Sequence, residues 1–150
     1  MEPTLVLGYG SELRSDDAAG LHVAQAVAER AEPGVAVRTA HQLTPELAAE
    51  LVDRDRVVLV DASVDVDRVA VRWLAADADR PPGSHHVDPG GLLAMAAMLG
   101  EPPREAAVVQ VPVTSLDVGF GLTAQTAAAA DEAVEVVLAL CRGEEPEGAT

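Results

Sequence analysis

Residues 5–20, LVLGYGSELRSDDAAG, carry the strongest indication of the fold: an apolar run, a turn with two glycines, two adjacent acids and a helix start. A strand that is covered on both faces need not alternate polar with apolar residues, so residues 4–8 are predicted to form a buried strand. Asp16 and Asp17 come just beyond its carboxyl end. In open α/β sheets, ligands bind at that edge. We therefore expect a mostly parallel sheet with functional acids along one edge.

The rest of the chain alternates strand patterns with helix patterns, which is typical of an α/β protein. A short strand is predicted at 35–39, apolar strands at 57–60 and 106–111, and a half-exposed antiparallel edge strand at 69–74. Helices are predicted at 20–31, after Thr44-Pro45, from Asp88-Pro89 to Gly100, and from near Thr123 to Cys141. The predicted architecture is a three-layer sandwich of the phosphorylase/hydrolase-like kind: a roughly five-stranded, mostly parallel twisted sheet with helices on both faces.

Composition limits the class of protein. The 150 residues are 49% hydrophobic, which fits one domain over residues 1–142, followed by an acidic tail at 143–150 that we expect to be disordered. The net charge of −15 argues against nucleic acid or an anionic membrane as a partner. No apolar run is long enough to span a bilayer. The single cysteine, Cys141, excludes an internal disulfide and a cysteine-rich metal site. We expect a cytoplasmic protein.

Three polar features are predicted to meet at one edge of the sheet: Asp16/Asp17, Asp61 directly after the strand at 57–60, and His85/His86 in a proline-rich loop. Two carboxylates and an imidazole suit a divalent transition metal and leave coordination positions open. Each feature also has a purely structural explanation. Acids at a helix start stabilise its dipole, an acid at a strand end can cap a turn, and loop histidines are commonly solvated.

Other sites fit less well. Gly8-x-Gly10 suggests a dinucleotide site, but Leu13 stands where the third glycine belongs, and two acids at the helix start would repel a pyrophosphate. No serine lies in a Gly-x-Ser-x-Gly turn. Cys141 is expected in the core, and His22 and His41 on the surface.

Three segments resemble the hydrogenase maturation endopeptidases: residues 8–20, residues 60–62 and residues 84–96. The resemblance covers nearly the whole chain, including Gly119-Phe-Gly-Leu-Thr123. It implies a protease that removes a C-terminal extension from the large-subunit precursor of a nickel–iron hydrogenase once nickel has been inserted. The metal-contacting residues it implies are Asp17, Asp61 and His85, with His86 as the alternative to His85. The nickel is supplied by the substrate, and no tightly bound organic cofactor is expected.

The sequence departs from the family pattern at several positions. Ser11 and Ala18 stand where many members have Asn and Gly, and residues 41–45, HQLTP, replace a glycine-threonine turn. The latter version is similar to relatives that serve soluble, cofactor-reducing hydrogenases, so the cognate hydrogenase stays open. Two other functions also remain open: a docking module that binds the precursor without cutting it, and a metallohydrolase that carries its own zinc.

Overall fold

A computed structural model describes residues 1–75, 87–114, 116–117 and 119–146. Within this part of the chain, five strands form one sheet in the order β2-β1-β3-β5-β4. Their bounds are β1 (Thr4–Tyr9), β2 (Val35–Ala40), β3 (Arg56–Ser63), β4 (Ala70–Trp73) and β5 (Glu105–Pro112). Strands β2, β1, β3 and β5 pair in parallel, and β4 pairs antiparallel with β5 at the edge. The predicted α/β class and the antiparallel edge strand are confirmed.

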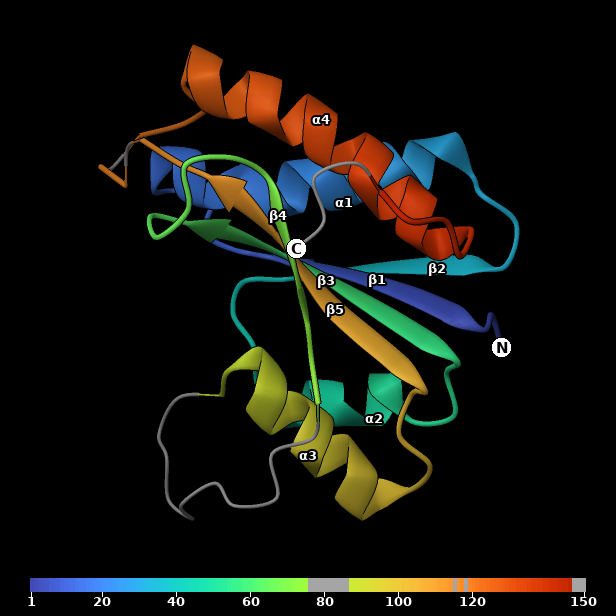
Figure 1. Cartoon of the computed structure of the whole chain (residues 1–150). Coiled ribbons are helices and arrows are strands. Elements are labelled where there is room, and N and C mark those ends of the chain that lie inside the picture. Colours follow the sequence, from blue (N-terminus) through green and yellow to red (C-terminus); the bar gives the residue numbers. More distant parts are fainter. Residues whose placement is uncertain (76–86, 115, 118, 147–150) are drawn as a thin grey trace.

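Helices cover both faces of the sheet (Figure 1). Helices α1 (Ala19–Arg30) and α4 (Ala124–Cys141) lie together on one face, while α2 (Ala48–Leu51) and α3 (Pro89–Leu99) lie together on the other. Short 3₁₀ turns, η1 (Ser15–Ala18) and η2 (Pro45–Leu47), lead into α1 and α2. The predicted cap at Asp88 is present, because its side chain accepts a hydrogen bond from the first turn of α3, and Thr123 caps α4 in the same way. The predicted cap at Thr44 is wrong, because its side chain makes no capping hydrogen bond.

The core consists of two layers, one on each face of the sheet, because successive side chains along each strand point to opposite faces. Val6, Val58 and Val60 pack under α1 and α4, whereas Leu5 and Leu59 pack toward α2 and α3. All five of these side chains are fully buried. This double coverage explains why the strands read as unbroken apolar runs. It also fixes which strand-end side chains point to which face.

Strand order reverses between β1 and β3. From β1 the chain crosses by α1 to β2 on one side, and then returns by α2 on the opposite face to β3 on the other side. Such a reversal leaves a crevice beyond the carboxyl ends of the two strands, because the loops leave in opposite directions. The fold therefore directs attention to the residues that follow Gly8 in β1 and Val60 in β3.

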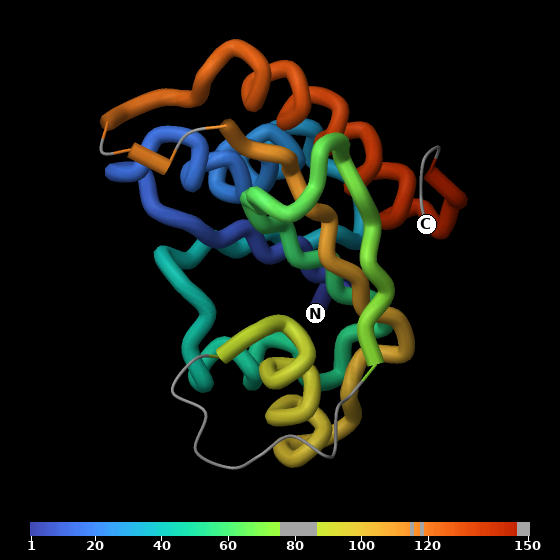
Figure 2. Tube along the Cα trace, turned by 60° about the vertical axis from the view of Figure 1, so that its left-hand side comes forward, coloured from blue at the N-terminus to red at the C-terminus, as the bar shows by residue number. Residues whose placement is uncertain are grey.

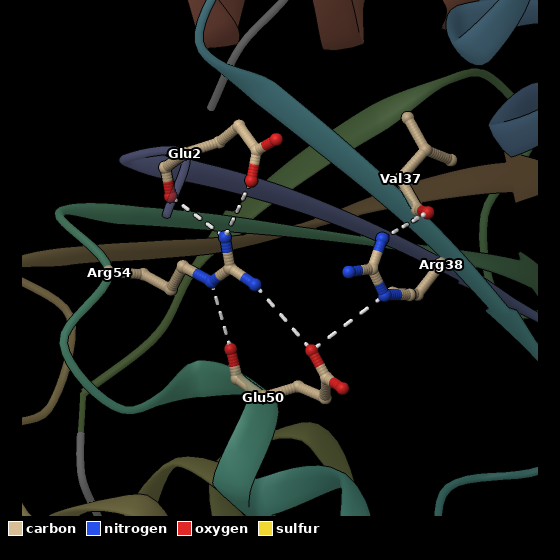
Figure 3. Close-up of polar contacts among 5 residues, drawn as sticks. All are labelled: Glu2, Val37, Arg38, Glu50 and Arg54. Atoms are coloured by element: carbon tan, nitrogen blue, oxygen red, sulfur yellow. Dashed lines mark hydrogen bonds and ion pairs between the residues drawn. The ribbon is translucent and has the colours of Figure 1, made fainter.

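At the opposite end of the sheet, Arg54 fixes the start of the chain to α2 (Figure 3). Its guanidinium donates to the backbone carbonyls of Glu2 at 2.8 Å and Glu50 at 3.0 Å, and forms ion pairs with both carboxylates. The arginine is 6% exposed, and its buried charge is satisfied by these partners. This cluster is structural and lies away from the strand reversal.

The segment predicted as a disordered tail is described as far as residue 146. The backbone N–H groups of Gly143 and Glu144 donate to carbonyls of the last turn of α4, and Pro146 is buried. Residues 147–150 lie outside the described residues, so the tail stays a prediction there. No helix in the described part of the chain has the length and apolar character needed to cross a membrane.

Candidate functional site

Two glycines bring the first turn close to the end of β1. Gly10 has φ +152°, and a Cβ at this position would collide with the backbone carbonyl oxygen of Asp17. A Cβ on Gly20 would come within 2.5 Å of the Tyr9 carbonyl oxygen and 2.6 Å of that of Val60. The start of α1 thus packs directly on the ends of β1 and β3, which only glycine permits. This close packing places the two adjacent aspartates beside the strand reversal.

Asp16 is an internal anchor. Its carboxylate is fully buried and accepts hydrogen bonds from the backbone N–H groups of Thr114 (3.0 Å) and Thr123 (2.7 Å) and from both threonine hydroxyls (3.1 and 3.0 Å). Figures 1 and 2 show the segment before α4, in orange, beside the blue start of α1. The Asp16 side chain therefore stabilises the join between these two segments instead of capping its own helix.

Asp17 faces a pocket. One of its carboxylate oxygens accepts a hydrogen bond from the backbone N–H of Ser11 at 3.0 Å, which fixes the side chain across the turn. The pocket that it lines is also lined by Asp61. The structure therefore separates the two adjacent acids, with Asp16 inside the protein and Asp17 at the pocket.

Asp61 lies within β3, two residues before its last residue Ser63, so the prediction that the strand ends at Val60 is wrong; its neighbour on β1 is Tyr9, the last residue of that strand. The pKa of the Asp61 carboxyl is raised from 3.8 to about 6: burial is the main cause and the negative charge of Asp17 adds to it, while hydrogen bonds from the Tyr9 hydroxyl and the Ala62 N–H lower the pKa. Burial, together with the Asp61 charge, also raises the pKa of Tyr9, so its hydroxyl stays protonated and donates. Asp61 is therefore a largely buried carboxylate that titrates close to neutrality.

The pocket has a volume of about 380 Å³ and is open at the strand reversal. One side is formed by Tyr9 and Gly10, and the other by the loop after β2 and the start of α3. Three aspartates and one histidine line it, so its walls are polar and largely acidic: Asp17, Asp61, Asp88 and His41. Such a pocket attracts a cation and repels phosphate. Among the described residues, no three His, Cys, Asp or Glu side chains are grouped closely enough to hold a metal ion.

The predicted histidine ligands, His85 and His86, lie outside the described residues. Asp17 and Asp61 are brought to one pocket, which places two of the three predicted residue positions there. The described chain resumes at Val87, which also lines the pocket, followed by Asp88 and Pro89.

Sequence reasoning missed two pocket residues, Tyr9 and His41. His41 is exposed, as expected, but it lines the pocket, whereas His22 is exposed on α1 and is not among the residues that line this pocket. The sequence rule that identified Asp61, a polar residue after an apolar strand pattern, also applies to His41, which follows β2 directly. Cys141 packs against the core, and burial raises the pKa of its thiol to about 11, so it is not a nucleophile.

Nearly the whole chain is similar to proteins that mature hydrogenases. The sequence is 26% identical over 147 residues to the hydrogenase 2 maturation protease of Escherichia coli (strain K12), which covers 92% of this chain and 90% of that protein. The hydrogenase maturating endopeptidase HybD from E. coli superposes with a TM-score of 0.76 at 25% identity, over 93% of this chain and 92% of that chain.

A more distant structure shares the same fold. The [NiFe] hydrogenase maturation protease HybD from Thermococcus kodakarensis superposes with a TM-score of 0.67 at 22% identity, covering 91% of this chain and 97% of that chain. No family model matches the sequence.

Proposed function

Because this chain is a peptidase of the hydrogenase maturation endopeptidase family, we propose that it removes the C-terminal extension of a nickel–iron hydrogenase large-subunit precursor. We further propose that it acts only on nickel-loaded precursor and uses the substrate's nickel for recognition. The reaction would take place in the cytoplasm. The observation that carries this proposal is the pocket that Asp17 and Asp61 line at the strand reversal.

The two carboxylates have the chemistry that such a substrate needs. Carboxylate oxygens from separate elements, together with an imidazole, suit a divalent transition metal and leave positions open for other ligands. In the proposed site the imidazole comes from His85, with His86 as the alternative. Nickel presented by the precursor would polarise the scissile carbonyl or the attacking water as a Lewis acid.

The chain's own residues hold these carboxylates in place. Asp17 is held by the Ser11 N–H, and Asp61 by the Tyr9 hydroxyl and the Ala62 N–H. The raised pKa of Asp61 makes it available as a carboxylate above about pH 6. Because this largely buried carboxylate has lost part of its hydration, a cation that arrives with the substrate would stabilise its negative charge at this position.

A site of this kind also explains how cleavage would depend on correct metal insertion. Ligands of mixed oxygen and nitrogen type on separate loops bind a free ion less well than a closed four-ligand cage does. We therefore expect the purified protein to hold no tightly bound catalytic metal. Nickel already bound in the precursor would complete the site, so an immature precursor would not be cut.

The test is incubation of the protein with nickel-loaded and nickel-free precursor, followed by mass measurement of the large subunit. Wild type should shorten only the nickel-loaded form. The variants Asp17→Asn, Asp61→Asn and His85→Ala should each block processing, because residues that act on one ion lose function as a unit. Exposed residues away from the pocket provide the matched controls, Asp131→Asn on α4 and His22→Ala on α1, which should process normally.

Each alternative function predicts a different outcome. Equal processing of nickel-free precursor would contradict the dependence on nickel and favour a self-sufficient metallohydrolase. Stable binding of the precursor with no change in its mass would favour a docking module. If His86→Ala blocks processing while His85→Ala does not, the ligand is His86, and the metal-recognition proposal stands.

A further inference from the structure

Strand register places Tyr9 beside Asp61. Strands β1 and β3 are parallel, and their last paired residues are Gly8 and Val60, so Tyr9 and Asp61 are the next residue on each strand. Side chains alternate along a strand, and Leu7 and Leu59 point toward α2 and α3. Tyr9 and Asp61 follow each of these by two residues, so their side chains point to that same face.

The two side chains also touch. The Tyr9 hydroxyl hydrogen-bonds to the Asp61 carboxylate, and both residues line the pocket. The ring of Tyr9 packs against the apolar layer that contains Leu5 and Leu7. A tyrosine has only two side-chain torsions, and here the core restrains its ring, so its hydroxyl is held at a fixed point. The Asp61 carboxylate therefore has a rigid hydrogen-bond donor at the wall of the pocket.

We infer that Tyr9 is a positioning residue: its hydroxyl holds one oxygen of the Asp61 carboxylate and thereby turns the other toward the cation in the pocket. This inference rests on the proposed function, because it assigns Asp61 the role of a cation ligand. Tyr9 acts through Asp61 and needs no contact with the cation or with the scissile bond.

The physical reason lies in the freedom of a carboxylate. The last torsion of an aspartate is broad, so a carboxylate at the wall of an open pocket samples many orientations unless a partner fixes it. Hydrogen-bond partners of metal ligands commonly change metal affinity or activity by about 10–100-fold when they are removed. The Ala62 N–H also donates to Asp61, so loss of the Tyr9 hydroxyl should weaken the orientation without abolishing it.

The first experiment is a double-mutant cycle on the isolated protein. Tyr9→Phe removes the hydroxyl and keeps the ring, and Ni²⁺ affinity is measured by calorimetric titration for wild type, Tyr9→Phe, Asp61→Asn and the double variant. We expect Tyr9→Phe alone to weaken Ni²⁺ binding about tenfold or more. In the Asp61→Asn background the same change should have no further effect, because the hydroxyl acts only through the carboxylate. Thr39→Val, which removes an exposed hydroxyl at the end of β2, should bind like wild type.

The second experiment leaves the fold unchanged and uses Tyr9 as a probe. The sequence contains a single tyrosine, so 3-fluorotyrosine supplied during expression labels Tyr9 alone. The ¹⁹F resonance should move when Ni²⁺ is added to wild type. It should also move on Asp61→Asn substitution, and it should then no longer respond to Ni²⁺.

The results that overturn the inference are distinct from those that overturn the proposed function. The role of Tyr9 is overturned if Tyr9→Phe leaves Ni²⁺ affinity unchanged, or if it lowers the affinity equally with Asp61 and with Asn at position 61. It is also overturned if wild type shows no Asp61-dependent Ni²⁺ binding, or if the ¹⁹F resonance does not respond to Asp61→Asn. If the cycle is non-additive but wild type leaves nickel-loaded precursor uncut, the positioning role stands and the proposed function fails. If nickel-loaded precursor is cut and the cycle is additive, the proposed function stands and the positioning role of Tyr9 fails.

Discussion

Replacing Asp61 with asparagine should stabilise the folded protein at neutral pH. Burial raises the pKa of this carboxyl from 3.8 to about 6, so its ionised form is less favourable in the folded chain than in the unfolded chain. Each unit of this pKa difference corresponds to about 1.4 kcal/mol, so the free energy of unfolding should rise by at most about 3 kcal/mol. One side of the carboxylate meets the solvent of the pocket, so we expect a gain of about 1 to 3 kcal/mol.

The sign of the effect depends on pH. Below pH 3.8 the carboxyl is protonated in both states, and Asp61→Asn should change the free energy of unfolding little. As pH rises from 3.8 to about 6, the unfolded chain releases a proton that the folded chain retains, so wild-type stability falls relative to the variant. Above about pH 6 the difference should reach its full value. Asparagine carries no charge to desolvate, and its amide oxygen can still accept from the Tyr9 hydroxyl.

The assay is urea unfolding of wild type and Asp61→Asn between pH 4 and pH 8, with the difference in free energy of unfolding plotted against pH. The other carboxylates of this acidic chain titrate in both proteins, so their contribution cancels in the difference. A difference that stays the same at pH 4 and pH 8, or a wild type that is the more stable at pH 8, would refute the reasoning. The matching functional expectation is that the stabilised variant processes no precursor, so the site's chemistry is maintained at the expense of stability.

Other expected outcomes concern the frame around the pocket and its pH dependence. Asp16→Asn should lower the free energy of unfolding by about 3 kcal/mol in urea, because either orientation of the amide turns an NH₂ toward a backbone N–H, that of Thr114 or that of Thr123. Gly20→Ala should destabilise by about 3 kcal/mol or prevent folding, measurable as a lost thermal transition, because the new Cβ meets backbone oxygens at 2.5 and 2.6 Å. Arg54→Met should cost about 2 kcal/mol in the same urea assay, because the Glu2 and Glu50 carbonyls lose their donor (Figure 3). Processing by wild type should slow about tenfold per pH unit below about pH 6, as Asp61 is protonated, and a flat pH–rate profile would contradict its role.

The strands and helices were predictable because apolar strand runs and helix caps are both set by residues that are close in the sequence. Strand β3 lies between covering layers on both faces, so its apolar run is visible in the sequence, and the Asp88-Pro89 pair marks the start of α3 through its cap. The expected cap at Thr44 is less simple than the pattern suggests. Thr44 occupies the cap position, but its side chain makes no capping hydrogen bond and contacts the Glu46 carboxylate instead. Its helix accordingly begins as a 3₁₀ turn.

The division of labour between Asp16 and Asp17 was not visible in the residues themselves. Which of two adjacent acids turns inward depends on Thr114 and Thr123, whose place beside the first turn is set by the tertiary fold. The family resemblance identified Asp17 by its position in the motif, without explaining why Asp16 turns inward. The contact between Tyr9 and Asp61 likewise depends on strand register, which a strand pattern does not specify. Only the sheet order brings the ends of β1 and β3 together.

The opposite orientation of Asp16 and Asp17 has a consequence for how these positions change over evolution. Asp16 is matched to donors that lie 98 and 107 residues further along the chain, so a change of size or charge there is tolerated only if positions 114 and 123 change with it. In an alignment these three positions should covary. Position 17 has its constraint in the pocket, and it should accept any side chain that still delivers an oxygen there. Two neighbouring aspartates in one motif are thus under separate selection, one for assembly of the fold and one for its chemistry.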